Sequence, residues 1–233
     1  MKKNILWFVA LLFVFGCKKK QTVYDTKTEY FPLAVGSWII YDVDSLVYNS
    51  FTLTSYTHHF QLKELIASSF IDASNEKAFV LERYERDSIT QDFKLKNKWV
   101  EKNANNKAEK IEENQRFIKM TFPPIKNNTW KGNAYLQIDP NDENSKFLTD
   151  WDYKYSIVDE KISLGNHSFD SSITVLQHDD YIVRLQKSYF KEVYAKHVGL
   201  VYYQHTFLEQ QPSDPTWKSG FDVKATINSN GKN

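Results

Sequence analysis

Histidine has the side chain that metal binding or proton transfer would need, and for four of the six histidines the spacing indicates whether they can act together. His58 and His59 are adjacent in a segment of alternating apolar and polar residues. Neighbouring residues of a β-strand point to opposite faces, so we expect one half-buried and one exposed ring, not two ligands of one ion. His197 and His205 flank a predicted hairpin, but no acidic or cysteine partner lies at ligand spacing. The histidines therefore predict no metal site and no cofactor.

Oxygen ligands are concentrated in Asp139–Asp150, which matches an EF-hand calcium loop at several positions. The segment has Asn144 where that loop needs glycine and Asp150 where it needs glutamate, so we predict a solvated acidic loop. Carboxylate pairs such as Glu112-Glu113 and Asp179-Asp180 are typical of an exposed face or a turn. The chain contains no Gly-x-Ser-x-Gly, His-Glu-x-x-His, phosphate-loop or dinucleotide motif, and the sequence predicts no catalytic residue.

The N-terminus has the features of an export signal. Met1 to Asn4 is a short basic start, and Ile5 to Phe15 is an uninterrupted apolar run of 11 residues. A membrane-spanning helix needs about 20 apolar residues, so this run has the length of a secretory signal core. It ends in Val14-Phe15-Gly16-Cys17, which resembles the lipobox of bacterial lipoproteins, although Phe15 is bulkier than is usual there.

That resemblance implies attachment of diacylglycerol to Cys17, cleavage before it and acylation of the new amine. It also explains why Cys17 is the single cysteine, since another thiol would react in an oxidising compartment. Lys18, Lys19 and Lys20 follow the anchor, whereas acidic residues often follow the cysteine of surface-exposed lipoproteins. We therefore expect a lipid anchor in the outer membrane that faces the periplasm and not the cell surface.

Composition limits the class of the remaining chain. The 233 residues carry a formal charge of +1, with 41% apolar and 25% charged residues, which is typical of a folded protein without a nucleic-acid partner. We expect a lipoprotein signal peptide at 1–16, a lipid-anchored tether at 17–30, one β-rich domain at 31–229 and a disordered tail at 230–233. We also expect a monomer.

Period-two alternation predicts β-strands through most of the domain. Apolar residues alternate with polar ones in 56–63, 93–99, 151–157, 169–175 and 221–227, and 38–48 is rich in β-branched and aromatic residues. One apolar and one polar face is typical of an antiparallel sheet. The sequence therefore predicts an all-β, mainly antiparallel fold after the signal peptide: a single meander-type half-barrel, barrel or sandwich. The segment Phe60 to Phe70 would also suit a short helix.

Turn residues separate these strands. The predicted turns are 72–75, 103–106, 127–128, 165–166 and 178–180, and each of them contains Asn, Asp or Gly. Gly199 lies between the strand-like segments 191–196 and 200–208, as expected for a glycine of a hairpin or bulge.

Three segments together resemble a group of uncharacterised Bacteroidetes-type cell-envelope lipoproteins. They are Tyr30–Tyr41, with the letters YFPLAVGSWIIY; Thr121–Tyr135, with TFPP and then WKGNAY; and Val193–Tyr202, with VYAKHVGLVY. The resemblance implies a β-rich envelope protein, such as a half-barrel of the lipoprotein-carrier kind. It brings no activity and no catalytic residue to this chain.

The sequence leaves several classes of function open. We favour a binding or envelope-assembly module with an apolar, lipid or glycan ligand, and Trp130 and Tyr135 are candidate ligand contacts, although a role in the core is the simpler interpretation. The alternatives are an accessory glycan-binding lipoprotein, because aromatic residues reach 15%, and a hydrolase. An exposed aromatic row would favour glycan binding, and an open apolar trough a lipid carrier. A concave pocket with convergent polar groups of shifted pKa would favour an enzyme.

Overall fold

A computed structural model gives the structure of this protein, and it describes residues 25–138, 148 and 151–233. The described residues form one antiparallel sheet of twelve strands and a single turn of 3-10 helix, η1 (Thr28–Tyr30). The strands are β1 (Ser37–Asn49), β2 (Thr54–Ile71), β3 (Lys77–Arg86), β4 (Lys94–Ala104), β5 (Lys107–Glu112), β6 (Gln115–Thr121), β7 (Thr129–Lys131), β8 (Asp152–Leu164), β9 (His167–Ile182), β10 (Gln186–Ala195), β11 (Gly199–Gln211) and β12 (Asp214–Lys232). In this part of the chain no helix has the length and apolar character to cross a membrane.

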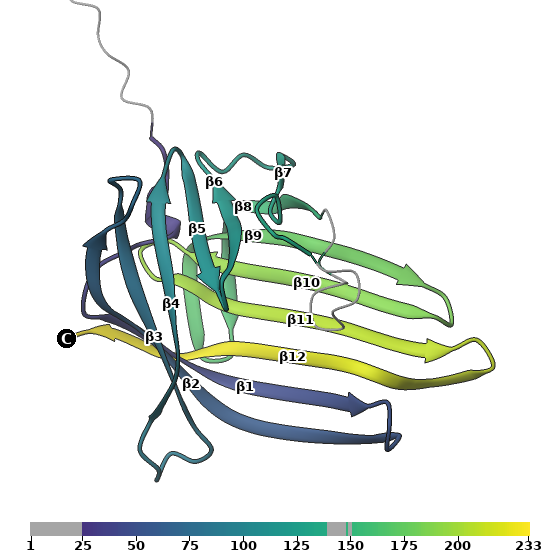
Figure 1. The fold of residues 1–233 in the computed structure, drawn as a ribbon. Helices are drawn as coiled ribbons and strands as arrows, with labels where there is room; N and C mark the ends of the chain where they lie inside the picture. The colour runs from purple at the N-terminus through teal and green to yellow at the C-terminus, as the bar shows by residue number, and fades with distance from the viewer. Residues whose placement is uncertain (1–24, 139–147, 149–150) are drawn as a thin grey trace, which may run out of the picture.

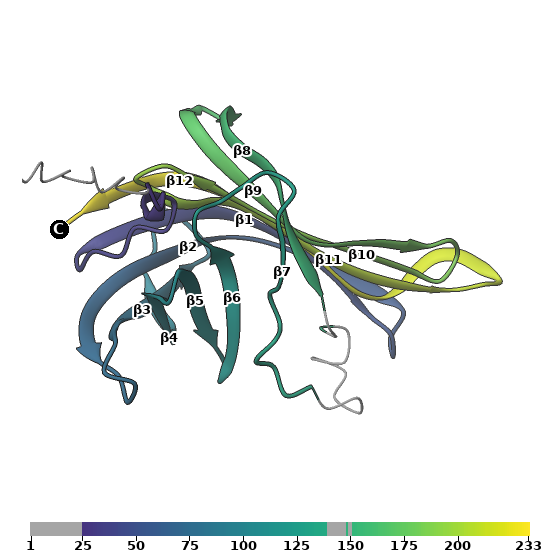
Figure 2. The ribbon, with the colours of Figure 1, turned by 90° about the horizontal axis from the view of Figure 1, so that it is seen from above.

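The sheet consists of two meanders, β1 to β6 and β7 to β12, which are joined by pairing of the first strand with the last. Its order is β6-β5-β4-β3-β2-β1-β12-β11-β10-β9-β8-β7, so β1 pairs with β12 and every other neighbour is also a sequence neighbour (Figure 1). The two end strands approach each other, because the Ile118 N–H of β6 donates to the Gly132 oxygen beside β7 at 2.8 Å. Seen from above, β2 to β6 curl round to this junction (Figure 2). The predicted all-β antiparallel class is confirmed, in the form of a single, nearly closed barrel.

Six strands continue beyond the barrel as a projecting arm. The outer parts of β1, β2, β9, β10, β11 and β12 point away from η1 and the C-terminus (Figures 1 and 2). The register places β3 beside β2 only from Gln61 onward, and β8 beside β9 only up to Leu176. The arm therefore has two edge segments, 54–60 and 177–182, that pair on one side only.

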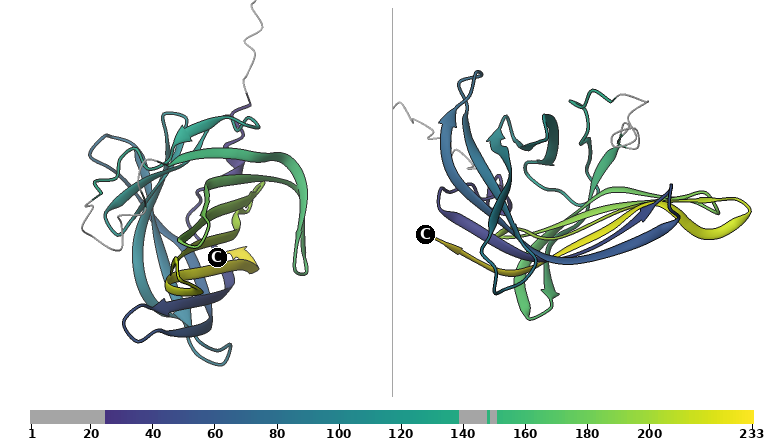
Figure 3. Two further views of the ribbon diagram at one scale, coloured as in Figure 1. Left: turned by 90° about the vertical axis from the view of Figure 1, so that its right-hand side faces the viewer. Right: turned by 60° about the horizontal axis from the view of Figure 1, so that its bottom comes forward.

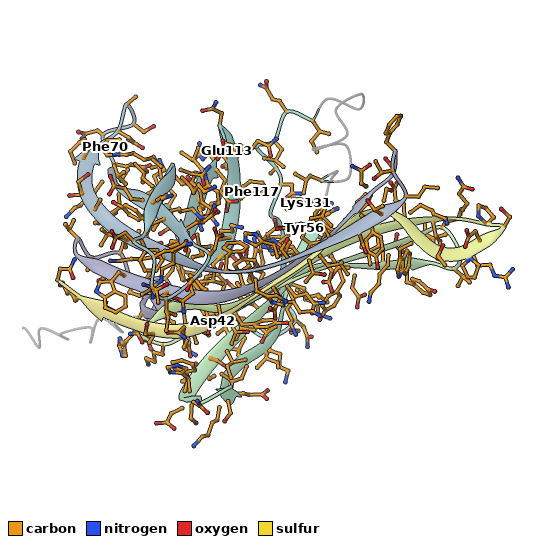
Figure 4. All side chains as sticks on the ribbon, turned by 90° about the horizontal axis from the view of Figure 1, so that it is seen from below. Asp42, Tyr56, Phe70, Glu113, Phe117 and Lys131 are labelled. Atoms are coloured by element: carbon orange, nitrogen blue, oxygen red, sulfur yellow. The ribbon has the colours of Figure 1, made fainter. Side chains whose placement is uncertain are left out.

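Alternation on the strands explains which residues are buried. On β1, Tyr41 and Val43 are buried while Asp42 and Asp44 are exposed. Figure 4 shows side chains crowded between the curled strands, with Phe117 of β6 among them and Asp42 on the opposite side of the sheet. The segment Phe60 to Phe70, which also suited a helix, lies within β2.

A second, smaller core lies on the outer face of the sheet. Val193, Ala195, Val201 and Ile227 are buried there against the far part of the β8–β9 hairpin. This hairpin arches over the ends of β10 to β12 (Figure 3, left), and its His167 Nε2 lies 2.8 Å from the Asn228 oxygen. One part of the β8–β9 hairpin thus belongs to the barrel, and the other part covers the outer wall of the barrel.

Three sequence-based boundaries differ from the structure. The predicted turn at 178–180 is wrong: these residues pair with β10, and His178 stacks on Trp151, so β9 continues to a turn at 183–185. The tail expected at 230–233 contains the end of β12, which pairs with the start of β1. The tether expected to reach residue 30 ends earlier, because Tyr30 is fully buried.

Candidate functional site

A partly open cavity of about 350 Å³ lies inside the barrel at the end that carries η1. Its rim is formed by the chain after η1, the start of β1, the β10–β11 turn and the end of β12. Its apolar wall and its charged floor are separate sets of side chains. The wall includes Phe31, Pro32, Trp38, Ile39, Tyr41, Ile66, Leu81, Val198 and Leu200. The floor includes Glu64, Glu101, Lys110, Lys119, Glu192 and Tyr194.

The N-terminal segment 27–36 holds the rim in place. The Glu29 oxygen accepts a hydrogen bond from the His197 N–H at 2.8 Å, and the Phe31 oxygen accepts one from Asn103 Nδ2 at 3.0 Å. The Tyr30 hydroxyl lies 2.6 Å from Ser171 Oγ and also donates to Asp159. The segment that leads to the N-terminus therefore crosses one end of the barrel and forms part of the cavity wall.

A chain of alternating charges runs across the floor from β3 to β10. Arg83 Nε donates to Glu64 Oε1 at 3.0 Å, and Lys110 Nζ lies 3.5 Å from the same oxygen. Lys110 Nζ is also 3.6 Å from Glu101 Oε1 and 4.0 Å from Glu112 Oε1. These charges come from β2, β3, β4 and β5, which form one half of the sheet.

The chain of charges then crosses to the other half of the sheet. Lys119 Nζ of β6 donates to Glu192 Oε1 of β10 at 2.9 Å and lies 3.3 Å from Glu112 Oε1. The Tyr194 hydroxyl donates to Glu192 Oε2 at 2.5 Å. His205 Nε2 is buried 3.7 Å from Glu192 and has no hydrogen-bond partner among the described residues. The floor thus connects strands that are far apart in the sheet order.

Burial and neighbouring charges give these groups unusual proton affinities. The pKa of Glu101 is raised to about 7, mainly by burial, with Lys110 lowering it and the nearby Glu64 and Glu112 raising it. Burial alone would also raise the pKa of Glu192, but Lys119, assisted by His205 and Tyr194, holds it well below its ordinary value. Burial tends to lower the pKa of Lys110, yet the surrounding carboxylates raise it overall. Glu101 is therefore the floor group that gains or loses a proton near neutral pH.

Neither sequence-predicted ligand contact lines this cavity. Trp130 packs on Tyr153 and Tyr155, with ring centroids 5.8 and 4.6 Å away, and its Nε1 donates to the Ile118 oxygen at 2.8 Å. Tyr135 is half-exposed, with the Arg116 guanidinium 4.3 Å from its ring centroid. Trp130 thus closes the barrel between β6 and β7, and Tyr135 lies on the surface.

The histidines are placed much as their spacing indicated. His58 is half-buried beside Asp87 and His59 is exposed beside Asp44, as expected for adjacent strand residues. His197 lies in the β10–β11 turn with φ 65° and lines the cavity rim. Among the described residues no three His, Cys, Asp or Glu side chains converge as metal ligands would.

Cys17 and the signal peptide lie outside the described residues, as does the acidic segment 139–150 apart from Leu148.

The sequence did not reveal the floor of the cavity. Glu112 was interpreted as part of an exposed pair, but it lies against Lys119 inside the barrel, and only Glu113 is at the turn. Lys110 and Glu101 face each other across β4 and β5. Charged residues at inward positions of a strand resemble an ordinary polar face until the register is known. The alternation of residues along each strand was compatible with inward-pointing charges, but no motif distinguished these charged residues from solvent-exposed ones.

Comparisons with known proteins give only distant similarity. No family model and no curated protein matches the chain. A protein of Bacteroides fragilis NCTC 9343, described as exported and as having a YmcC-like fold, is 10% identical with a TM-score of 0.43, over 86% of this chain and 98% of that one. A protein of Parabacteroides distasonis ATCC 8503, described as a lipoprotein, is 10% identical with a TM-score of 0.35, over 87% and 98% of the two chains. Both sources are Bacteroidetes, but scores this low carry no conclusion about function.

Proposed function

We propose that this protein is a cell-envelope lipoprotein, held to the outer membrane through Cys17, that binds a small molecule inside its barrel. The observation that carries the proposal is the cavity of about 350 Å³ with an apolar wall and a charged floor. Ligand sites in proteins have volumes of about 300–1,000 Å³, with mostly apolar walls and a few polar groups that orient the ligand. The volume is at the small end of that range, which favours a small molecule over an acylated protein.

The aromatic residues support this function more than a glycan-binding platform. The tyrosines Tyr41, Tyr153, Tyr155 and Tyr194 are buried inside the barrel. Tyrosine and tryptophan at such positions pack the core, as is common in sheets. A platform for sugar rings would instead need aromatic faces that lie side by side on the surface.

A titration with the uncharged fluorescent probe N-phenyl-1-naphthylamine tests the binding function. The probe should bind the wild-type protein with increased fluorescence, and Leu81→Trp should abolish the increase because Leu81 is buried in the cavity wall. Leu95→Trp is the matched control, because Leu95 is about half exposed on the neighbouring strand. Equal fluorescence in wild type and Leu81→Trp, with both proteins folded by circular dichroism, would show that the cavity is not the binding site.

The anchor is tested separately in cells. Cys17→Ser should abolish incorporation of a fatty-acid analogue and leave an uncleaved or mislocalised precursor. Label that persists on the serine variant contradicts lipid attachment at Cys17. Protease treatment of intact cells should leave the wild-type protein intact if it faces the periplasm, and its complete loss would show surface exposure.

A hydrolase is the second candidate, because Glu101 has the pKa of a general acid and faces the cavity. Acid–base catalysis also needs a second group to activate water or act as nucleophile. The other carboxylates of the floor are bound to cations: Glu64 to Arg83, and Glu192 to Lys119. Turnover of a chromogenic ester or glycoside by wild type, lost in Glu101→Gln, would replace the binding function by catalysis.

A further inference from the structure

Two groups of the cavity floor have hydrogen-bonding capacity that the protein does not use. Within the described part of the chain, the nearest cation to the Glu101 carboxylate is Lys110, whose Nζ lies 3.6 Å from Oε1, longer than a normal hydrogen bond. Lys110 Nζ has no carboxylate oxygen closer than 3.5 Å. In contrast, Lys119 and Arg83 each donate to a carboxylate at 2.9–3.0 Å. Both loosely held groups line the cavity, so a ligand can reach them.

The charges that line the floor do not balance. Four carboxylates of the chain of charges, Glu64, Glu101, Glu112 and Glu192, share three cations, Arg83, Lys110 and Lys119, while Lys232 lines the cavity near its rim. With all seven groups of this chain ionised, it carries one net negative charge. Lys110 lies within 4.0 Å of three carboxylates, so its own charge is already compensated. Among the described floor carboxylates, Glu101 has only the shared Lys110 as ion-pair partner, whereas Glu64, Glu112 and Glu192 each have a closer cation, so we assign the excess negative charge to Glu101.

Aromatic rings stand beside the floor. Phe31, Trp38, Tyr41 and Tyr194 all line the cavity. The face of an aromatic ring attracts a cation by about 0.5–2 kcal/mol, and more strongly where water is excluded. A cavity lined both by aromatic rings and by a weakly paired carboxylate suits an organic cation.

We propose that the ligand is a small organic cation, an ammonium group on an apolar body, whose charge pairs with Glu101 at the cavity floor. This inference rests on the proposed binding function and specifies its ligand class. An anion would add a second negative charge beside Glu101. A neutral ligand would leave the Glu101 carboxylate with only the distant, shared Lys110 as its partner.

A pH dependence follows from the surroundings of Glu101. The charged and titratable groups that face it are Glu64 of β2, Arg83 of β3, Lys110 and Glu112 of β5, Lys119 of β6, Glu192 and Tyr194 of β10 and Tyr41 of β1. Of these, Glu112 and Glu192 stay ionised at neutral pH because the lysines lower their pKa. A bound cation stabilises the ionised form of Glu101, so binding should weaken as Glu101 is protonated below pH 7.

A series of ligands with one alkyl chain and different head groups tests the ligand class. Octylammonium, octan-1-ol and octanoate would displace N-phenyl-1-naphthylamine at pH 8 and at pH 5.5. We expect octylammonium to bind at least about tenfold more tightly than octan-1-ol at pH 8, and to lose most of this preference at pH 5.5. Glu101→Gln should remove the preference at both pH values while octan-1-ol still binds. Glu113→Gln, at the β5–β6 turn, is the matched control and should behave as wild type.

The outcomes separate the ligand class from the binding function. Equal binding of the three compounds, or tightest binding of octanoate, overturns the cation while the cavity remains a binding site. An ammonium preference that does not change between pH 8 and 5.5 also overturns the role of Glu101. Failure of the probe and of all three compounds to bind contradicts the proposed function itself.

Discussion

Glu101 is a carboxyl group whose pKa the fold brings close to neutral pH. Its side chain is almost fully buried, and burial raises its pKa from 4.5 to about 7. Between these two pH values the folded protein keeps a proton that the unfolded chain loses, so stability falls as the pH rises from 4.5 to 7. The ionised carboxylate is thus maintained at a cost, as is common at sites that meet a ligand.

Glu101→Gln should therefore stabilise the protein at pH 8 and have little effect at pH 4.5. The rise of the Glu101 pKa to about 7 corresponds to as much as about 3 kcal/mol in the free energy of unfolding. Urea denaturation of both proteins at the two pH values measures the difference. A variant that is less stable than wild type at pH 8 would contradict the burial of an uncompensated charge.

Lys119 and Glu192 form the ion pair that connects the two halves of the sheet inside the barrel. Lys119→Met should destabilise the protein by about 3–5 kcal/mol, because Glu192 would remain charged and buried without its main partner. The double variant Lys119→Met with Glu192→Leu should recover most of the loss. Equilibrium unfolding of the single and double variants measures the coupling, and losses that simply add would contradict a direct pair.

Gly199 opens β11 with φ 100°, a conformation that residues with a β-branched side chain rarely adopt. A Cβ added at Gly199 would have room, since the nearest atom, Pro32 Cδ, is 3.5 Å away. A substitution there would therefore destabilise the protein through backbone strain and not through a clash. Gly199→Val should lower the free energy of unfolding by about 1–3 kcal/mol. His197→Ala should cost less, because His197 is a turn residue, and thermal melts that rank the two variants in the reverse order would contradict this.

At the scale of the elements, alternation was sufficient to predict strands but not their surroundings. Tyr41 and Val43 alternate with Asp42 and Asp44, and the sheet buries the first pair and exposes the second. In β5, by contrast, the consecutive residues Ala108, Glu109 and Lys110 are all buried, although two of them are charged. Pairing across strands decides which polar face meets water, and pairing is not encoded in any single strand.

Turns were predictable where the backbone needs a left-handed residue. Asn105 and Asn106 both have positive φ between β4 and β5, and Gly165 has φ 55° between β8 and β9. The segment His178–Asp180 has similar composition but is strand, because His178 stacks on Trp151 and its neighbours pair with β10. A tertiary contact here overrides a local preference.

At the scale of the whole molecule, the cavity lies at the end of the barrel from which the chain leads to the proposed anchor. Residue 25 is eight residues from Cys17, so an extended chain would span at most about 29 Å. The segment 27–36, which follows, is bonded across the barrel end and contributes Phe31 and Pro32 to the cavity wall. Anchoring at Cys17 would therefore keep the cavity rim close to the membrane, while the projecting arm points away from η1.

The arm is the main competitor of the cavity for apolar ligands. Its tips expose Phe51, Leu53, Ile182 and Val183. A binding signal from an apolar probe could arise there as well as inside the barrel. A measurement that locates the ligand is for this reason more decisive than one that only detects it.

The most direct test is a methyl NMR titration of the protein, labelled at Ile, Leu and Val, with octylammonium at pH 8. If the ligand binds inside the barrel, the methyl signals of Ile66, Leu81 and Leu200 should shift, since these residues line the cavity. The signals of Leu53, Ile182 and Val183 on the arm should not shift. Shifts confined to the arm, or no shift at the cavity residues at saturating ligand, would contradict binding inside the barrel.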